Sequence, residues 1–516
     1  MIDPSNLFGK CTDCDLLTLR QELIAYKAEA HSLRALRVKD AELFKKLEDE
    51  LVETKAKLRY SIDQRYGKKN EQQGSKKTEG QLKNAELSPK KRGRQPNSKA
   101  PKRRTMDNMP QITENALVPD LLRTCQCCGL PLHPMPPEQV KVKEIKVNAY
   151  VRVINKERLV KSCKCPETPS IVTAPAVGPL FSGSNLGVST CCELLMGRFH
   201  DGLPMHRVLE RLSTYGLDLA SGTVHSLIPN FLSLLSPVSK AIGARNREAS
   251  HWHADETTHR VFVDVPGKVG HRWYLWVFAA HDTTIFMMRK NRSADAIRDH
   301  LGPDAAGIIS ADRAKMYISY ASENKNIKIA FCWVHAKRDF LKIAIEYPEL
   351  KPWTDMWVDR ISELFHLNKI RSIENNENLL REAVAKFETQ WKEELAVAKE
   401  HTPQKKVLNS LKFHWTGLTV FLDHPEIPME NNKAELAIRW EVIARKSIYG
   451  CRSLNSAKLL ETMATITVTL EQNKLSVRDW LMSYLMACAQ NGGKPPADIS
   501  NWLPWNKKAS DHPAVG

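Results

Sequence analysis

The sequence predicts a multidomain α/β protein, and three observations support that fold class. The chain has 516 residues, more than one hydrophobic core normally holds, and 42% of them are hydrophobic. Residues 246–349 contain three runs with strand patterning and then alternating helix and strand patterns, as in a mixed sheet. Residues 15–60 instead carry a heptad pattern without Gly or Pro, which is typical of one long helix.

The N-terminal segment, residues 1–64, is predicted to form a coiled coil. A mostly apolar seam repeats every seven residues, with Glu and Lys crowding the other positions, which favours self-association. The alternative is an amphipathic helix packed on its own protein. The seam consists of Leu16, Leu19, Leu23, Tyr26, Ala30, Leu33, Arg37, Asp40, Phe44, Leu47, Leu51, Thr54 and Leu58.

Residues 65–122 are predicted to be a basic, flexible linker, because Lys, Gln, Ser, Asn and Pro dominate their composition. Residues 88–104 carry eight basic residues and no acidic one, so this tract suits DNA phosphates. Arg92 and Arg94 also suit an A·T minor groove. The alternative is a linker that only aids solubility. The predicted DNA-binding residues of the tract are Arg92, Arg94, Lys102, Arg103 and Arg104.

Residues 123–170 are predicted to be a zinc-binding module. Two close cysteine pairs flank a β-like stretch at residues 140–154, and four thiolates from two such pairs match a structural Zn²⁺ site. Cys127 is a spare thiol, and buried free cysteines are the alternative. The predicted ligands are Cys125, Cys128, Cys163 and Cys165.

Residues 171–245 are predicted to be a helical region that resembles a helix-turn-helix. One helical pattern breaks at Gly216, and Ser221 is a candidate N-cap for the next helix. Plain packing of two helices predicts the same pattern, so DNA reading and packing are equally good interpretations.

Residues 246–349 are predicted to be the first part of a catalytic core. Its first strand carries Asp255, and a buried carboxylate on a strand is costly unless it pairs or binds a cation. Asp312 ends the strand at residues 307–311, and Glu435 lies on a helix of the core's last part, residues 429–455. A helical insertion at 350–428 and a C-terminal helical domain at 456–516 complete the predicted organisation.

Three carboxylates on separate elements suit paired divalent cations. Two Mg²⁺ ions, or Mn²⁺, would supply what phosphodiester cleavage and strand transfer require, and Asp255, Asp312 and Glu435 would be their ligands. The alternatives are a helix-surface ion pair between Glu435 and Arg439, and a strand-end cap by Asp312. If the carboxylates do bind metal ions, three basic residues of the helix that carries Glu435 would contact DNA phosphates. They are Arg439, Arg445 and Lys446.

The charge and cysteine content narrow the class of partner. A net charge of +17 indicates a polyanion, with double-stranded DNA ahead of an acidic membrane. No stretch has the apolar length to span a bilayer, and the N-terminus lacks a signal-peptide layout. The 12 cysteines suit metal binding in a reducing compartment, so we expect a cytoplasmic, DNA-associated protein without membrane contact.

Several blocks of the sequence resemble the insertion sequence 66 family of bacterial DDE transposases. They are HADETTHRVF, SADRAKMY, FCWVHAKRDF, MENNKAELAIR, LPMHRVLERLSTYG and the terminal WLPW. The resemblance implies an RNase H-like core, cut-and-join chemistry on the element's own ends, and small accessory proteins. It places Asp255, Asp312 and Glu435 at the acidic positions, and His335 and Arg338 beside the site or on DNA. Glu430 and Glu441 remain rival third carboxylates.

The predicted function is therefore a transposase that binds terminal inverted repeats, pairs two ends as a homodimer or higher oligomer, and joins them to target DNA. Two alternatives remain open at the level of the sequence. One is a domesticated DNA-binding protein that has lost catalysis, and the other is a metal nuclease without end preference. The intact acidic triad argues against the first alternative, and the N-terminal half is unexplained by the second.

Overall fold

The computed structural model describes residues 41–66, 147–160, 169–174, 178–266, 271–374 and 377–506, with isolated positions between 113 and 162. The chain divides into two units, one of residues 1–75 with 149–516 and one of residues 76–148. The first unit carries the regular structure. None of its described helices is long and apolar enough to cross a bilayer.

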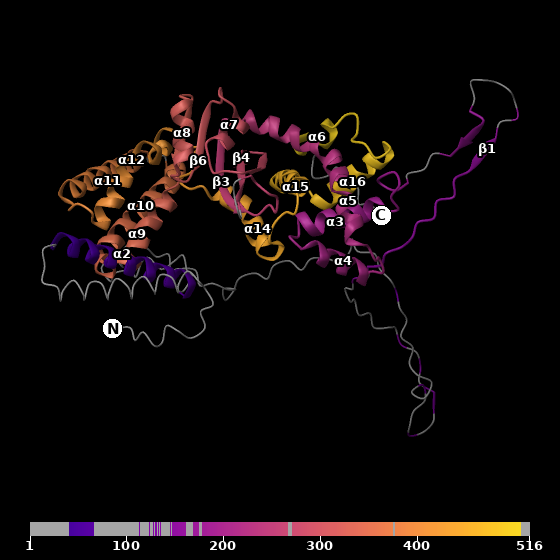
Figure 1. Ribbon diagram of the computed structural model, residues 1–516, viewed down its shortest axis with the longest axis horizontal. Helices are drawn as coiled ribbons and strands as arrows, with labels where there is room; N and C mark the ends of the chain where they lie inside the picture. Colours follow the sequence, from indigo (N-terminus) through magenta and orange to yellow (C-terminus); the bar gives the residue numbers. More distant parts are fainter. Residues whose placement is uncertain are drawn as a thin grey trace. The chain divides into compact units, whose positions relative to one another are not determined.

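A five-stranded mixed sheet lies at the centre of the first unit, in the order β5-β4-β3-β6-β7 (Figure 1). Three consecutive strands pair antiparallel, and two further strands, each preceded by a helix, pair in parallel on the other side. The predicted mixed α/β core is therefore confirmed. The elements are β3 (His251–His259), β4 (Trp273–Ala279), β5 (Thr284–Arg289), α7 (Asp295–Leu301), β6 (Gly307–Ala311), α8 (Lys315–Glu323) and β7 (Ile327–Phe331).

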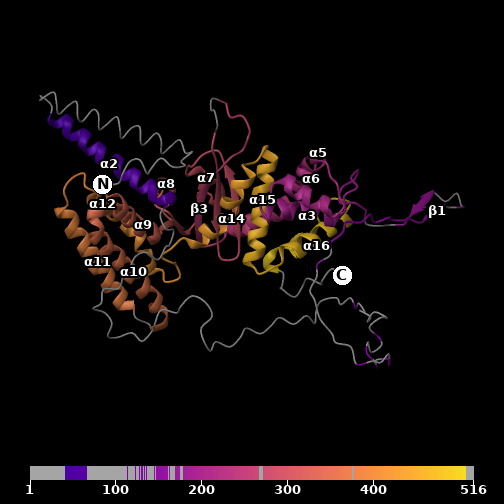
Figure 2. The ribbon, with the colours of Figure 1, turned by 90° about the horizontal axis from the view of Figure 1, so that it is seen from below.

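Strands β4 and β5 read as almost continuous apolar runs because both of their faces are buried. The helices α14 (Asn432–Ile448) and α15 (Leu454–Gln472) contact this half of the sheet, with α6 (Ile228–Arg247) against β5 and α15 (Figure 2). Helices from before the sheet (α6) and from near the C-terminus (α14 and α15) thus share one hydrophobic core with the strands.

The edge of the sheet at β5 is closed by side chains of α15. Thr465 and Thr469 accept hydrogen bonds from the amides of Phe286 and Thr284 at 3.0 and 3.1 Å, and Glu461 accepts one from Met288 at 2.6 Å. Every fourth residue of α15 meets every second residue of β5. Four helical residues and two strand residues each advance about 6–7 Å, so the helix side chains and the strand amides keep the same spacing. The amides at this edge of the sheet, which could otherwise pair with a strand of another chain, therefore have hydrogen-bond partners within the same chain.

A helical layer follows β7 and corresponds to the predicted insertion. Its helices pack on α9 through a cluster of aromatic rings that includes Trp357, Phe387 and Trp415. The elements are α9 (Trp333–Glu346), η3 (Pro348–Leu350), α10 (Lys351–Glu374), α11 (Glu377–Val397), α12 (Pro403–Leu418) and α13 (Val420–Asp423).

The long N-terminal helix is present as α2 (Ala41–Tyr66), and it contacts α9 of the same chain. Arg59 donates a hydrogen bond to the carbonyl of Glu346 at 3.0 Å, and Lys342 lies over the ring of Tyr60. The described half of the predicted coiled coil therefore packs on its own protein, which was the alternative interpretation. The seam before Ala41 lies outside the described residues, and self-association stays a prediction.

The helical region before the sheet differs from the prediction in one detail. Ser221 is the first residue of α5 and not its cap, because Ala220 takes the extended conformation that precedes the helix. Gly216 breaks the helices as expected, at a φ of 87° that favours glycine. The elements are α3 (Val188–Phe199), α4 (Met205–Thr214), α5 (Ser221–Ser226) and α6, and near the C-terminus α16 (Val477–Gln490), η4 (Ser500–Trp502) and η5 (Pro504–Asn506).

The prediction of a β-like stretch at residues 140–154 is wrong for the residues of it that the structure describes. Its described residues form no strand, and Tyr150 and Val151 are more than four-fifths exposed. Period-two alternation requires a partner strand and one buried face, and the described residues of this stretch have neither. A short hairpin of β1 (Arg158–Val160) and β2 (Ile171–Thr173) follows instead.

Candidate metal-dependent active site

The register of the sheet brings the two predicted aspartates to the same level. β3 and β6 run parallel, and their last paired residues are His253 and Ser310. Asp255 and Asp312 each lie two residues further along, at the C-terminal side of this pairing. Adjacent parallel strands present residues of equal register on the same face, and sites in such sheets lie beyond these ends. The two carboxylates therefore converge.

The glutamate is delivered by α14, whose first turn is fixed to β3. Asn431 is 1% exposed, and its amide donates to the carbonyl of Ala254 at 2.7 Å. Its side-chain oxygen lies 3.0 Å from Nδ1 of His253. Glu435 follows one turn later, and its amide donates to the carbonyl of Asn431. A single buried asparagine thus sets where the Glu435 side chain leaves the helix.

The electrostatics of Asp255 show that the three carboxylates interact. The pKa of Asp255 is raised to about 7, chiefly by burial and also by the charges of Asp312 and Glu435, while the amide of Glu256 and the guanidinium of Arg292 oppose the shift. Like charges gathered in a half-buried site disfavour ionisation unless a cation joins them. The three predicted acidic residues therefore form one electrostatic cluster.

Glu256 is a fourth carboxylate of the cluster that sequence reasoning did not assign. Its side chain is 2% exposed, accepts a hydrogen bond from the Tyr317 hydroxyl at 2.8 Å and forms an ion pair with Arg292. Its pKa is raised to about 7, chiefly by burial and also by the charges of Asp312 and Asp255, while Arg292 and Tyr317 oppose the shift. Neighbours on a strand face opposite sides, so the sequence alone did not place Glu256 with Asp255.

Arg292 joins the two sides of this cluster and was also missed. Besides its contact with Glu256, its guanidinium lies 3.4 Å from Oδ2 of Asp312. The other oxygen of Asp312 accepts from the amide of Ala314 at 2.9 Å, so the predicted capping role is met by a local turn and not by the helix cap itself. No motif in the sequence marks Arg292, because its role depends on the folded position of the loop after β5.

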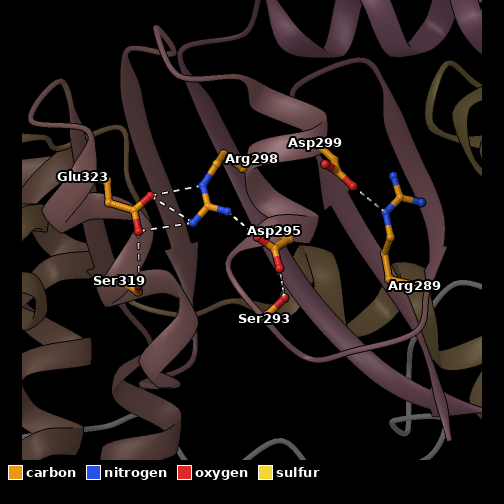
Figure 3. Close-up of polar contacts among 7 residues, drawn as sticks. All are labelled: Arg289, Ser293, Asp295, Arg298, Asp299, Ser319 and Glu323. Atoms are coloured by element: carbon orange, nitrogen blue, oxygen red, sulfur yellow. Dashed lines mark hydrogen bonds and ion pairs between the residues drawn. The ribbon is translucent and has the colours of Figure 1, made fainter. Parts of the chain in front are cut away.

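The loop that carries Arg292 is bounded by polar contacts at both ends (Figure 3). Arg289, at the end of β5, pairs with Asp299 of α7 at 3.1 Å. Arg298 of α7 pairs with Glu323 of α8 at 3.0 Å and also with Asp295. These pairs are solvent-exposed and each contributes little to stability, but together they restrict where the loop runs.

Side chains of α9 flank Glu435 on its other side. Nδ1 of His335 lies 4.0 Å from Oε1, and the guanidinium of Arg338 lies 3.8 Å from Oε2. Glu435 thus faces α9, and no ion pair with Arg439 is present among the described residues. Cys332, the cap of α9, brings its thiol close to the same carboxylate.

The rival third carboxylates lie in different surroundings. Glu441 is 1% exposed, and its Oε1 lies 3.2 Å from Nδ1 of the fully buried His259, at the other end of β3. Burial raises the pKa of Glu441 to about 7, and the charges that act on it are those of Arg198 and Arg445. Glu430 precedes α14. Among the three candidates, Glu435 is the one whose charge acts on Asp255.

The remaining predicted DNA contacts divide into two groups. Arg439 and Lys446 are exposed on α14, whereas Arg445 is held against β3, where it donates to the hydroxyl of Thr257 at 2.7 Å. Five basic residues and four cysteines lie outside the described residues, namely Arg92, Arg94, Lys102, Arg103, Arg104, Cys125, Cys128, Cys163 and Cys165.

The donor set of the cluster fits hard divalent cations. Asp255, Asp312 and Glu435 offer carboxylate oxygens, the ligands that Mg²⁺ and Mn²⁺ prefer. The structure thus defines a mixed α/β protein with a gathering of acids whose chemistry suits divalent metal ions.

Comparison with known proteins gives the family. Residues 183–459, more than half of the chain, match the transposase IS66 family, and the chain belongs to that family. Its relatives include two uncharacterized proteins of Sinorhizobium fredii (strain NBRC 101917 / NGR234). The protein y4qI is 24% identical over 61% of each chain, and y4jD is 24% identical over 75% of this chain and 78% of its own length. The resemblance inferred from the sequence blocks is thus confirmed.

Proposed function

We propose that the chain is a DDE-type transposase that binds the terminal inverted repeats of a mobile DNA element and cuts and joins its ends. The observation that supports this proposal is the register of β3 and β6, which brings Asp255 and Asp312 to the same level, together with the charges of Asp312 and Glu435 that contribute to the raised pKa of Asp255. The strand order of the sheet, three antiparallel strands followed by two parallel ones, supports the RNase H-like assignment of the core.

The reaction needs an activated hydroxyl and a stabilised leaving oxygen. Two divalent ions held by the acidic residues would supply both. Asp255, between the other two acids, would contribute to both ion sites, while Asp312 and Glu435 would each complete one. The amide of Ala314 and the groups of α9 around Glu435 hold these side chains in orientation before the DNA arrives.

The DNA would approach across α14. Arg439 and Lys446 are exposed on the helix that carries Glu435, and side chains of this kind contact phosphates irrespective of sequence. Recognition of the terminal repeats would come from the basic linker, the zinc module with Cys125, Cys128, Cys163 and Cys165, and the helices around Gly216. A dimer or higher oligomer would hold two ends, with small accessory proteins as further partners.

Strand transfer with a labelled end fragment, target DNA and Mg²⁺ tests the proposal. The unmodified chain should join the fragment to the target, and Asp255→Ala should not, while both bind the fragment equally. Asp304→Asn, an exposed aspartate at the opposite end of β6, serves as the control and should join normally. Binding without joining by the unmodified chain would instead favour a domesticated DNA-binding protein. Cleavage without end preference would favour a plain nuclease.

A further inference from the structure

Cys332, His335 and Glu435 bring three different metal-binding groups to one place. One ligand atom from each, a sulfur, an imidazole nitrogen and a carboxylate oxygen, lies within 4.8 Å of the other two. Among the described residues no other set of three such groups meets at this spacing. The acidic cluster needs hard oxygen ligands only, so a thiol and an imidazole beside it are not explained by Mg²⁺.

The backbone fixes two of these groups independently of any ion. Cys332 follows β7, and its amide donates to the carbonyl of Ala311 at 3.0 Å, beside the end of β6. The amide of Trp333 donates to the carbonyl of Met429 at 2.8 Å, which ties the start of α9 to the segment before α14. Cys332 is the N-cap of α9 and His335 lies in its first turn, and their ligand atoms lie within 4.8 Å of each other.

Two of the facing atoms are buried without hydrogen-bond partners. They are Nδ1 of His335 and Oε1 of Glu435, and they lie 4.0 Å apart, too far for a hydrogen bond. Two ligands of one tetrahedral zinc ion, at about 2.0–2.3 Å from the metal, lie roughly 3.4 Å from each other. A small movement of either side chain would satisfy both atoms with a single shared ion.

We propose that Cys332, His335 and Glu435 form a binding site for one transition-metal ion of the Zn²⁺ class. The thiolate selects such an ion over Mg²⁺, and the thiol proton passes to solvent when the Cys332–metal bond forms. Three protein ligands leave a fourth position open, as in zinc sites that are not closed by protein alone. Arg338 pairs with the other oxygen of Glu435 and leaves Oε1 for the ion.

The ion enters from the side of His335 and Glu435. Their side chains are 31% and 29% exposed, whereas Cys332 is 2% exposed and forms the floor of the site. This binding does not depend on the proposed transposition reaction, because it involves no DNA. Glu435 is shared with the acidic cluster, so the ion would sit beside the proposed catalytic ions.

Metal content of the full chain, measured without DNA, tests the site. The chain is stripped of metal, loaded with Zn²⁺ and dialysed, and Cys332→Ser and His335→Gln should each retain about one ion per chain fewer than the unmodified protein. Loading with Co²⁺ should give a thiolate-to-cobalt absorption band that is weaker in Cys332→Ser by a matching amount. Cysteines of the predicted zinc module contribute equally to all variants, so the difference isolates this site.

Cys451→Ser is the matched control. Cys451 is also 2% exposed and lies 3.6 Å from Nε2 of His259, but within the part of the chain that the structure describes it belongs to no set of three converging ligands. It should retain the full metal content. Equal metal content in Cys332→Ser, His335→Gln and the unmodified chain overturns the proposal, and so does an equal loss in Cys451→Ser. The partly exposed His335 gives a variant that folds even if Cys332→Ser does not.

Discussion

Two carboxylates of α14 lie against the same strand, β3, in opposite kinds of environment. Glu435 contributes to the raised pKa of Asp255, is 29% exposed and lies 3.8 Å from the guanidinium of Arg338. Glu441 lies about 9 Å further along the helix axis. It is 1% exposed and faces His259, with the charges of Arg198 and Arg445 nearby. Burial raises the pKa of a carboxyl to about 7 at both ends, in Asp255 and in Glu441.

The comparison shows that a raised pKa alone does not identify a catalytic acid. Perturbed groups gather at active sites, but buried structural pairs are perturbed as well. What separates the two ends is the number of acids that gather there and the access of solvent. Several acids that solvent reaches are suited to cations and substrate, whereas a single enclosed acid beside a buried histidine holds the helix to the strand.

The largest expected effect is on joining at the open end. Asp312→Asn keeps the shape of the side chain but removes its charge, so strand transfer should fall by about a thousandfold or more. Binding of the end fragment should remain within about twofold, because the DNA contacts lie elsewhere. The rate of joining and the affinity for the end fragment are measured in parallel with the control Asp304→Asn. A variant that joins normally would remove Asp312 from the site.

The next effect is on stability at the closed end. Glu441→Ala leaves His259 and Arg198 without their acidic neighbour and should lower the free energy of unfolding by about 3 kcal/mol. Joining by the folded fraction at low temperature should persist. Glu435→Ala should give the reverse result, with joining lost and stability nearly unchanged. Denaturant unfolding and strand transfer of both variants check the contrast, which fails if Glu441→Ala abolishes joining without loss of stability.

A smaller effect concerns the cost of holding Asp255. Its pKa rises from 3.8 to about 7 in the folded chain, so the folded state binds more protons than the unfolded state between these values. Stability without metal should therefore decrease as the pH rises from about 4 to 7. Asp255→Asn removes this penalty and should be more stable than the unmodified chain at pH 8 by roughly 2 kcal/mol. Thermal unfolding in chelator measures the difference, and a less stable Asp255→Asn chain would contradict it.

The smallest effect is the pH dependence of Mg²⁺ binding. Below a pKa of about 7 the ion must displace a proton from Asp255, so affinity should increase by about tenfold per pH unit up to that value and then level off. Calorimetric titration of the full chain with Mg²⁺ at several pH values, without DNA, measures it. An affinity that does not change between pH 5 and 8 would separate Asp255 from the ions.

The strands could be predicted because their patterns are local. The runs at β3 to β7, with one aspartate within β3 and one directly after β6, follow from alternation, apolar length and position along the chain. The short stretch at 140–154 shows the limit of the same rule. Its alternation is as regular, but its described residues have no partner strand, so the pattern alone does not make a sheet.

The parts that could not be predicted depend on long-range contacts. Asn431 anchors Glu435 through hydrogen bonds to β3, which lies far away in the sequence. Arg292 and Glu256 come into contact only in the folded sheet. The hydrogen bonds from β5 amides to α15 side chains likewise depend on the equal spacing of helix and strand residues once the two elements pack together. The N-cap of a helix can also shift by one residue without changing the fold, as from the predicted Ser221 to Ala220.

The most direct test of the account is a crystal structure of the full chain with Mn²⁺, located by its anomalous scattering. The account predicts Mn²⁺ bound by the carboxylate oxygens of Asp255, Asp312 and Glu435, with Glu441 still against His259. A structure in which Mn²⁺ avoids these three side chains, or in which their oxygens lie too far apart to share ions, would contradict it.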